Sequence, residues 1–227
     1  MTDSDAPAFG PPDDDRAPAP PRGPESSLVA ILEESRALGF LGPGPVEGHL
    51  PHSLAFAAAV EDPPARAVDL GAGGGLPGLV LAALIWPDTH WVFVEAQQKR
   101  GVFLTEAVSD LGLEHRVDVL IERAEVVGRD EAHRGQYDLV VARSFGRPAV
   151  VAECAAPLLR VGGSLVVSEP PAGSEGRWSA EGLTELGFGA VVPSVADGNH
   201  LVRCPLVSPT PDRYPRRFGQ PTKRPLF

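Results

Sequence analysis

The sequence predicts an α/β fold with a mostly parallel seven-stranded sheet and helices on both of its faces. Its 227 residues, 43% of them hydrophobic, are enough for one globular domain with its own core. From residue 67 to residue 207, short apolar segments alternate with segments of helical periodicity, which is typical of strand–helix–strand units. A glycine-rich turn at 69–78 marks the point where the first strand gives way to a helix.

We expect the domain at 26–207, with an irregular segment on either side. Residues 1–25 are acidic and rich in proline, and we expect them to be disordered because they cannot bury enough apolar surface. Residues 208–227 form a basic, proline-rich C-terminal tail, and its cations are Arg213, Arg216, Arg217, Lys223 and Arg224. Two interpretations of this tail stay open, a solvated end or a segment that binds an RNA backbone.

Composition excludes several classes of protein. No segment approaches the roughly 20 apolar residues of a membrane span, and the acidic N-terminus does not resemble a signal peptide, so we expect a cytoplasmic protein. Cys154 and Cys204 are far apart in the sequence, which predicts buried, reduced thiols rather than a disulfide framework. The formal net charge of −10 argues against indiscriminate nucleic-acid binding, since phosphate contacts depend on Lys and Arg.

The expected elements follow in order. Two helices occupy 26–62: the first places Leu28, Ile31, Leu32 and Leu38 on one face and ends at Gly39, and the second lies between Pro45 and the pair 63–64. The strands are short and apolar, and we place them at 67–70, 91–95, 117–121, 137–142, 164–168, 190–195 and 201–207. Helices at 76–86, 99–111, 148–159 and 179–186 connect them.

The glycine-rich turn fits two ligand patterns. Gly73, Gly75 and Gly78 satisfy G-x-G-x-x-G, which favours a dinucleotide. Asp69 extends the pattern to D-x-G-x-G-x-G, which favours S-adenosylmethionine, because a carboxylate suits a cationic ligand and opposes a pyrophosphate. Glu95, at the end of the next strand, could hold a ribose in either case. A turn without a ligand is the third alternative.

Further motifs make residues 36–170 resemble the bacterial 16S rRNA guanine-N7 methyltransferase family, also called glucose-inhibited division protein B. The motifs are 38–43, His49, 53–54, 69–78, 99–100, 103–104, 123–125 and 143–145, with a similar basic C-terminus at 214–226. The resemblance implies a Rossmann-like class I methyltransferase with S-adenosyl-L-methionine as its cofactor and a role in rRNA processing. It further implies 16S rRNA or the small ribosomal subunit as partner, and we expect a monomer that binds neither membrane nor DNA.

The resemblance also implies roles for individual residues. Asp69, Gly71, Gly73 and Leu76 would line the methionine end of the cofactor, Glu95 its ribose, and Ala124 and Glu125 its adenine. Arg143 would lie beside the cofactor or the incoming RNA, and either Arg143 or Phe145 could stack on the acceptor base. No catalytic acid or base is expected, because guanine N7 carries a lone pair and no proton. No metal is expected either, since His49 and His52 lack further ligands nearby in the sequence.

Four departures from the family leave alternatives open. The chain lacks an N-terminal Tyr-Asn-Leu-Thr, has His52 and Glu169 where the family has Asp and Lys-Gly, and is unusually charged at 128–135. A methyltransferase of the same fold acting on another RNA or a small molecule therefore remains an alternative, as does a non-catalytic ribosome-associated protein. A dinucleotide oxidoreductase is the weakest. Arg143 could also have a purely structural role, as a partner of Glu169 or Asp138.

Overall fold

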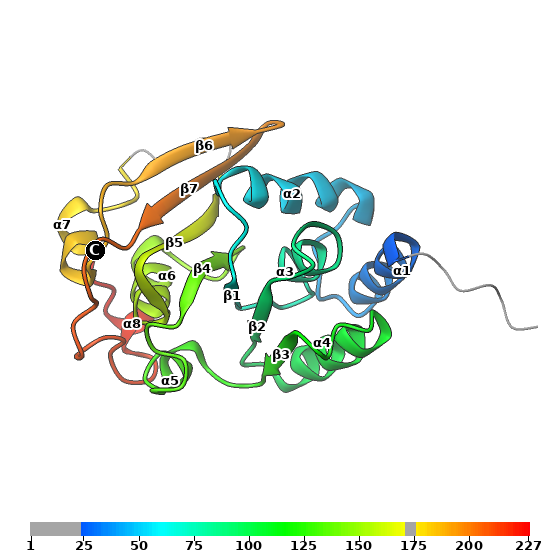
Figure 1. Cartoon of the computed structure of the whole chain (residues 1–227), viewed down its shortest axis with the longest axis horizontal. Coiled ribbons are helices and arrows are strands. Elements are labelled where there is room, and N and C mark those ends of the chain that lie inside the picture. The colour runs from blue at the N-terminus through cyan, green and yellow to red at the C-terminus, as the bar shows by residue number, and fades with distance from the viewer. Residues whose placement is uncertain (1–23, 171–175) are drawn as a thin grey trace, which may run out of the picture.

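The computed structural model describes residues 24–170 and 176–227, so the predicted disorder of 1–25 falls almost wholly outside it. It contains one seven-stranded sheet in the order β3-β2-β1-β4-β5-β7-β6, which confirms the predicted strand number (Figure 1). The strands are β1 Arg66–Leu70, β2 His90–Val94, β3 Val117–Leu120, β4 Tyr137–Ala142, β5 Leu159–Glu169, β6 Val192–Ala196 and β7 Asn199–Pro205.

Strands β1 to β5 run parallel, and β6 and β7 are antiparallel additions at one edge. After β1 the chain crosses outward to β2 and β3, and it then returns to place β4 on the other side of β1. The strand order therefore reverses between β1 and β4. In open parallel sheets, the carboxyl ends of the strands at such a reversal are the usual place for a ligand.

Side chains alternate between the two faces of the sheet and build two cores. Val68 and Val140 pack on the face covered by α5 (Ala124–Val127), α6 (Pro148–Ala155) and α7 (Ala180–Leu186). Ala67 and Leu139 pack on the opposite face. The elements that cover this face are α1 Pro24–Ala37, η1 Val46–His49, α2 Leu50–Ala58, α3 Gly78–Val80, η2 Leu81–Ile85 and α4 Gln98–Asp110.

Several predicted elements differ from the structure in detail. The helix expected at 76–86 is a short α3 followed by a π-helical turn, η2, because Trp86 N–H bonds to the carbonyl of Leu81, five residues back. The helix expected at 148–159 ends as a 3₁₀ turn, η3 (Ala156–Leu158), where Pro157 lacks an N–H. Helices α5 and α8 (Gln220–Lys223) were not predicted, since four residues are too few to show a period.

Residues 208–227 pack against the domain, so the first interpretation of this segment, a solvated end, is wrong (Figure 1). Tyr214 is buried, and the Arg216 guanidinium forms two hydrogen bonds, of 2.8 and 2.6 Å, with the carboxylate of fully buried Glu153. Composition misled here because five cations and many prolines read as a solvated end, whereas one of those cations neutralises an acid of the core.

The charged segment at 128–135 explains part of this packing. Arg134 donates hydrogen bonds to the backbone carbonyls of Thr210, Pro211 and Tyr214. This one guanidinium therefore satisfies a run of backbone acceptors that neither helix nor sheet could satisfy.

Within the described residues, no helix is long and apolar enough to span a bilayer.

Candidate functional site

The glycine-rich turn follows β1 and faces the loop that follows β4. Gly71 has φ +75°, and a Cβ atom there would lie 2.5 Å from the ring of Phe145. A Cβ atom on Gly78 would lie 2.5 Å from the carboxylate of Asp69. Both positions therefore require glycine. Gly71 needs it for its positive φ and for its close contact with Phe145, and Gly78 needs it for its close contact with Asp69. The ring of Phe145 supports the turn.

Asp69 lies beneath this turn and is fully buried. Its Oδ2 accepts a hydrogen bond of 2.8 Å from Gly78 N–H, while Oδ1 has no partner among the described residues. Burial raises the pKa of Asp69 to about 7, although the hydrogen bond from Gly78 opposes the shift. A carboxyl group that titrates near neutrality therefore lies under the candidate cofactor turn.

Glu95 follows β2 and is held by backbone donors. Its Oε2 accepts from Gly73 N–H at 2.9 Å and its Oε1 from Gln97 N–H at 2.8 Å. Each carboxylate oxygen has a second lone pair that can accept from a diol hydroxyl. Glu95 therefore has a fixed geometry, and it also ties the glycine-rich turn to β2.

Two adjoining cavities lie along this edge of the sheet. The first, of about 360 Å³, is lined by Gly71, Gly73, Leu76, Arg100 and Arg143, among others. The second, of about 200 Å³, is lined by Glu95, Ala124 and Phe145 and shares Gly71, Arg100 and Ser144 with the first. The predicted cofactor-binding residues that line these cavities thus follow the ends of β1, β2 and β4 or lie in α5.

Glu125 is placed differently from its neighbour Ala124. Its buried Oε1 accepts a hydrogen bond of 3.0 Å from Gly219 N–H, which attaches the C-terminal segment to α5. Hydrogen bonds from Gly219 and Arg123, acting against burial, lower the pKa of Glu125. This side chain therefore stabilises the fold, and Glu125 is not among the residues that line the two cavities.

Arg143 projects from the end of β4 into the region between the turn and α2. Its Nη2 lies 3.1 Å from His49 Nδ1, and its Nη1 is buried without a partner among the described residues. Burial lowers the pKa of Arg143, and the charge of Asp69 opposes that shift. The alternative prediction that Arg143 pairs with Glu169 or Asp138 is wrong, because Glu169 pairs with Arg177 and Asp138 pairs with Arg160.

His49 and His52 both face Arg143. Burial, followed by the positive charge of Arg143 and then the proximity of His49, lowers the pKa of His52 to about 4, so the imidazole of His52 is neutral at physiological pH. Its Nε2 is buried and unpartnered among the described residues, as is that of His49. No group of three His, Cys, Asp or Glu side chains in the described chain is placed to hold a metal ion.

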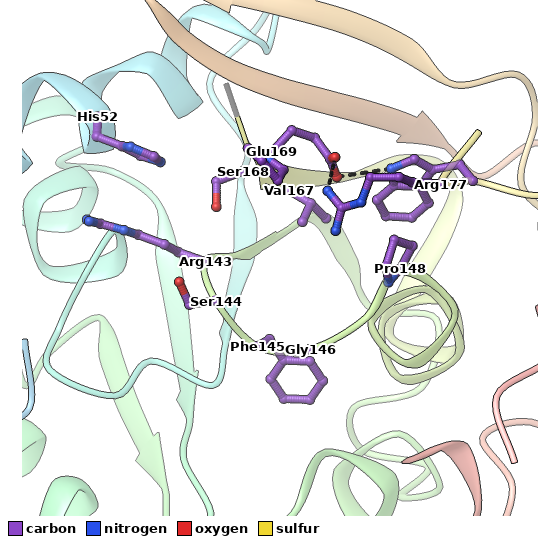
Figure 2. Close-up of a pocket in the computed structure, with 12 residues that line it drawn as sticks. His52, Arg143, Ser144, Phe145, Gly146, Pro148, Val167, Ser168, Glu169 and Arg177 are labelled. Atoms are coloured by element: carbon purple, nitrogen blue, oxygen red, sulfur yellow. Dashed lines mark hydrogen bonds and ion pairs between the residues drawn. The ribbon is translucent and has the colours of Figure 1, made fainter. Parts of the chain in front are cut away.

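A third cavity, of about 370 Å³, adjoins the first through Arg143 and Ser144. Figure 2 shows His52 and Arg143 on one side of it and Glu169 with Arg177 on the other. Arg177 pairs with Glu169, so the acid noted at the end of β5 is neutralised. The sequence pattern did not identify Arg177 or Trp178, because they follow β5 without a motif.

The chain is similar to known proteins over most of its length. The family described as rRNA small subunit methyltransferase G matches residues 45–169. Two relatives bear the name ribosomal RNA small subunit methyltransferase G. The one from Roseiflexus castenholzii is 38% identical over 189 residues, which cover 80% of this chain and 80% of the relative. The one from Moorella thermoacetica is 38% identical over 186 residues, covering 78% and 77%.

Solved structures show the same fold at low sequence identity. The O-methyltransferase TomG from Streptomyces achromogenes, in complex with SAM, has a TM-score of 0.54 at 18% identity and covers 80% of this chain and 90% of its own. An O-methyltransferase from Bacillus cereus, in complex with SAH, has a TM-score of 0.55 at 14% identity and covers 82% and 92%. These likenesses confirm the predicted Rossmann-like fold.

Proposed function

This chain belongs to the rRNA small subunit methyltransferase G family, and from that membership we propose that it methylates N7 of a guanine in 16S rRNA. Its cofactor is S-adenosyl-L-methionine. One structural observation carries the assignment to this site. The first cavity, beside the glycine-rich turn, and the third cavity, at the end of β5, meet at Arg143, where the strand order reverses. A donor and an acceptor bound in the two cavities would meet there.

The residues present fit this cofactor. The backbone of the turn and Leu76 would enclose the methionine end, Glu95 would accept from the ribose hydroxyls, and Ala124 would contact the adenine. The unpartnered Oδ1 of Asp69 leaves negative charge beneath the turn, which suits a ligand with a sulfonium and an ammonium group. We assign these roles to the cofactor half of the site.

The reaction needs alignment more than proton transfer. When bound, the cofactor supplies a methyl group on a positively charged sulfur. N7 of guanine attacks with its own lone pair, so no side chain has to remove a proton. Arg143 and neutral His52 would position the acceptor base through their unpartnered nitrogens, and Phe145 would hold the wall between the cavities. The protein thereby contributes orientation and exclusion of water.

We propose the small ribosomal subunit or its 16S rRNA as the partner, and the cytosol as the place where the two meet. The protein is proposed to act as a monomer without DNA or membrane as partner. Among the cations of the C-terminal segment, Arg217, Lys223 and Arg224 are exposed, which supports contact with RNA phosphates.

Transfer of a labelled methyl group to small subunits that lack this modification tests the proposal. We expect label in N7-methylguanine after digestion of the 16S rRNA. Label in another nucleotide, or in a small molecule, would favour a methyltransferase of different specificity. Cofactor binding without transfer to any substrate would favour the non-catalytic, ribosome-associated alternative.

The titration of Asp69 predicts a pH dependence for cofactor binding. Burial raises the pKa of Asp69 to about 7, and the charged form that suits a cationic ligand therefore increases between pH 6 and 7.5. We expect the Kd of S-adenosylmethionine to fall about eightfold over this range, in proportion to the ionised fraction of Asp69. Calorimetry checks this, with Asp69→Asn as the matched control, because asparagine can still accept from Gly78 but does not titrate. An equal pH dependence in both proteins would contradict the assignment.

A further inference from the structure

We infer that Arg177 contacts an RNA phosphate at the mouth of the third cavity and that Glu169 is the positioning residue that holds it there. The inference rests on the proposed function, because it assigns the third cavity to the acceptor nucleotide. Figure 2 shows Glu169 and Arg177 joined across the edge of this cavity, opposite His52 and Arg143.

Glu169 is far more buried than the arginine that it binds. The Glu169 side chain is 2% exposed, whereas that of Arg177 is 37% exposed. Trp178 donates its indole N–H to the other carboxylate oxygen of Glu169 at 3.0 Å. The carboxylate therefore fixes two consecutive side chains, and both line the cavity.

Among the described residues, Glu169 is the one hydrogen-bond partner of the Arg177 guanidinium. Its Nη1 is the nitrogen bonded to Glu169, and an arginine has five N–H donors in a planar fork. A fork that is anchored at one side and open to solvent at the other suits a phosphate, which accepts two parallel hydrogen bonds. Since Glu169 has already fixed the side chain, binding would cost less rotamer entropy than it would for a free arginine.

The charge of the cavity agrees with this assignment. Its lining contains two arginines, Arg143 and Arg177, and one carboxylate, Glu169. The fourth ionisable residue, His52, is neutral because burial and the charge of Arg143 lower its pKa. One net positive charge thus remains in a cavity whose cations stand on opposite sides. A nucleotide turned out of a stacked strand brings a base and a flanking phosphate together. Arg143 lies toward the first cavity, which we assign to the methyl donor, and Arg177 lies toward solvent. We therefore assign the phosphate contact to Arg177.

The test compares two variants that both lack the buried carboxylate. Glu169→Gln keeps a hydrogen-bond acceptor for Arg177, and the double variant Glu169→Gln with Arg177→Met removes the cation without leaving a buried charge unpaired. We expect the double variant to have a KM for undermethylated small subunits about tenfold higher than that of Glu169→Gln. We also expect its salt dependence, log KM against log salt concentration, to be shallower by about 0.7, the value of one phosphate contact in a single strand.

Two readouts separate this inference from the proposed function. The Kd of S-adenosylmethionine should be equal in both variants, and Arg177→Lys in the Glu169→Gln background should restore the salt slope. The matched control is Asp138→Asn with Arg160→Met, an ion pair at the amino ends of β4 and β5, which should leave both measurements unchanged. Equal KM and equal salt slope would overturn the role of Arg177 and leave the function intact. Absence of transfer by the unaltered protein would instead overturn the function.

Discussion

Replacing Arg143 by alanine is expected to lower the rate of methyl transfer on the order of 100-fold or more, the usual cost of removing a preorganised polar group from a reaction site. Arg143 lines both the cavity beside the glycine-rich turn and the cavity assigned to the acceptor. Its Nη1 is buried without a partner among the described residues, so it is free to bind a substrate atom. Single-turnover transfer of labelled methyl groups measures the effect.

The same substitution should change stability little. Arg143 is a half-buried cation whose hydrogen bond within the described chain goes to neutral His49, so the folded state gains little from its charge. We expect the free energy of unfolding to change by less than about 1 kcal/mol. Arg143→Lys, which keeps the charge but loses the planar fork, should recover part of the rate. If the loss of rate, converted to an activation free energy, equals the loss in the free energy of unfolding, Arg143 has a structural role.

Replacing Arg216 by alanine is expected to have the opposite profile, with a loss of about 3–5 kcal/mol in the free energy of unfolding. Arg216 pairs with Glu153, whose side chain is 0% exposed, and its backbone N–H also bonds to that carboxylate at 2.8 Å. Removing the guanidinium leaves a buried carboxylate without its countercharge. Denaturant unfolding measures the effect, and cofactor binding below the transition should stay intact.

Arg217 provides the control for this prediction, since it is the neighbouring arginine and is exposed. Arg217→Ala should change the free energy of unfolding by no more than about 0.5 kcal/mol. If RNA phosphates contact this segment, Arg217→Ala should weaken RNA binding and flatten its salt dependence. Deletion of 212–227 would combine the two effects, because it removes both cations. An Arg216→Ala protein as stable as Arg217→Ala would contradict the role given to Glu153.

The strands and the cofactor turn could be predicted from the sequence because their signals are local. A short apolar run such as 139–142, which contains two valines, defines its own strand, and glycines next to a strand end define a turn. The parallel topology then brings the ends of β1, β2 and β4 to one edge. Gly71, Leu76 and Glu95 consequently line adjoining cavities, as their positions at those ends suggested.

Charged residues were harder to interpret, because their roles depend on partners that are distant in the sequence. Glu169 looked like an acid in a site that should be basic, until Arg177 was found to pair with it. Glu125 was assigned to adenine by its motif, but its carboxylate binds a backbone N–H 94 positions away.

The sequence by itself therefore determined the fold, the family and the place of the glycine-rich turn, each of which depends on short-range patterns of apolar residues and glycines. Only the tertiary structure decided which ionisable side chains face the cavities and which stabilise the fold. The reason is physical: the free energy of a charge depends on its burial and on its nearest countercharge. For Arg143 near Asp69 and for Arg216 beside Glu153, that countercharge is brought close only by folding.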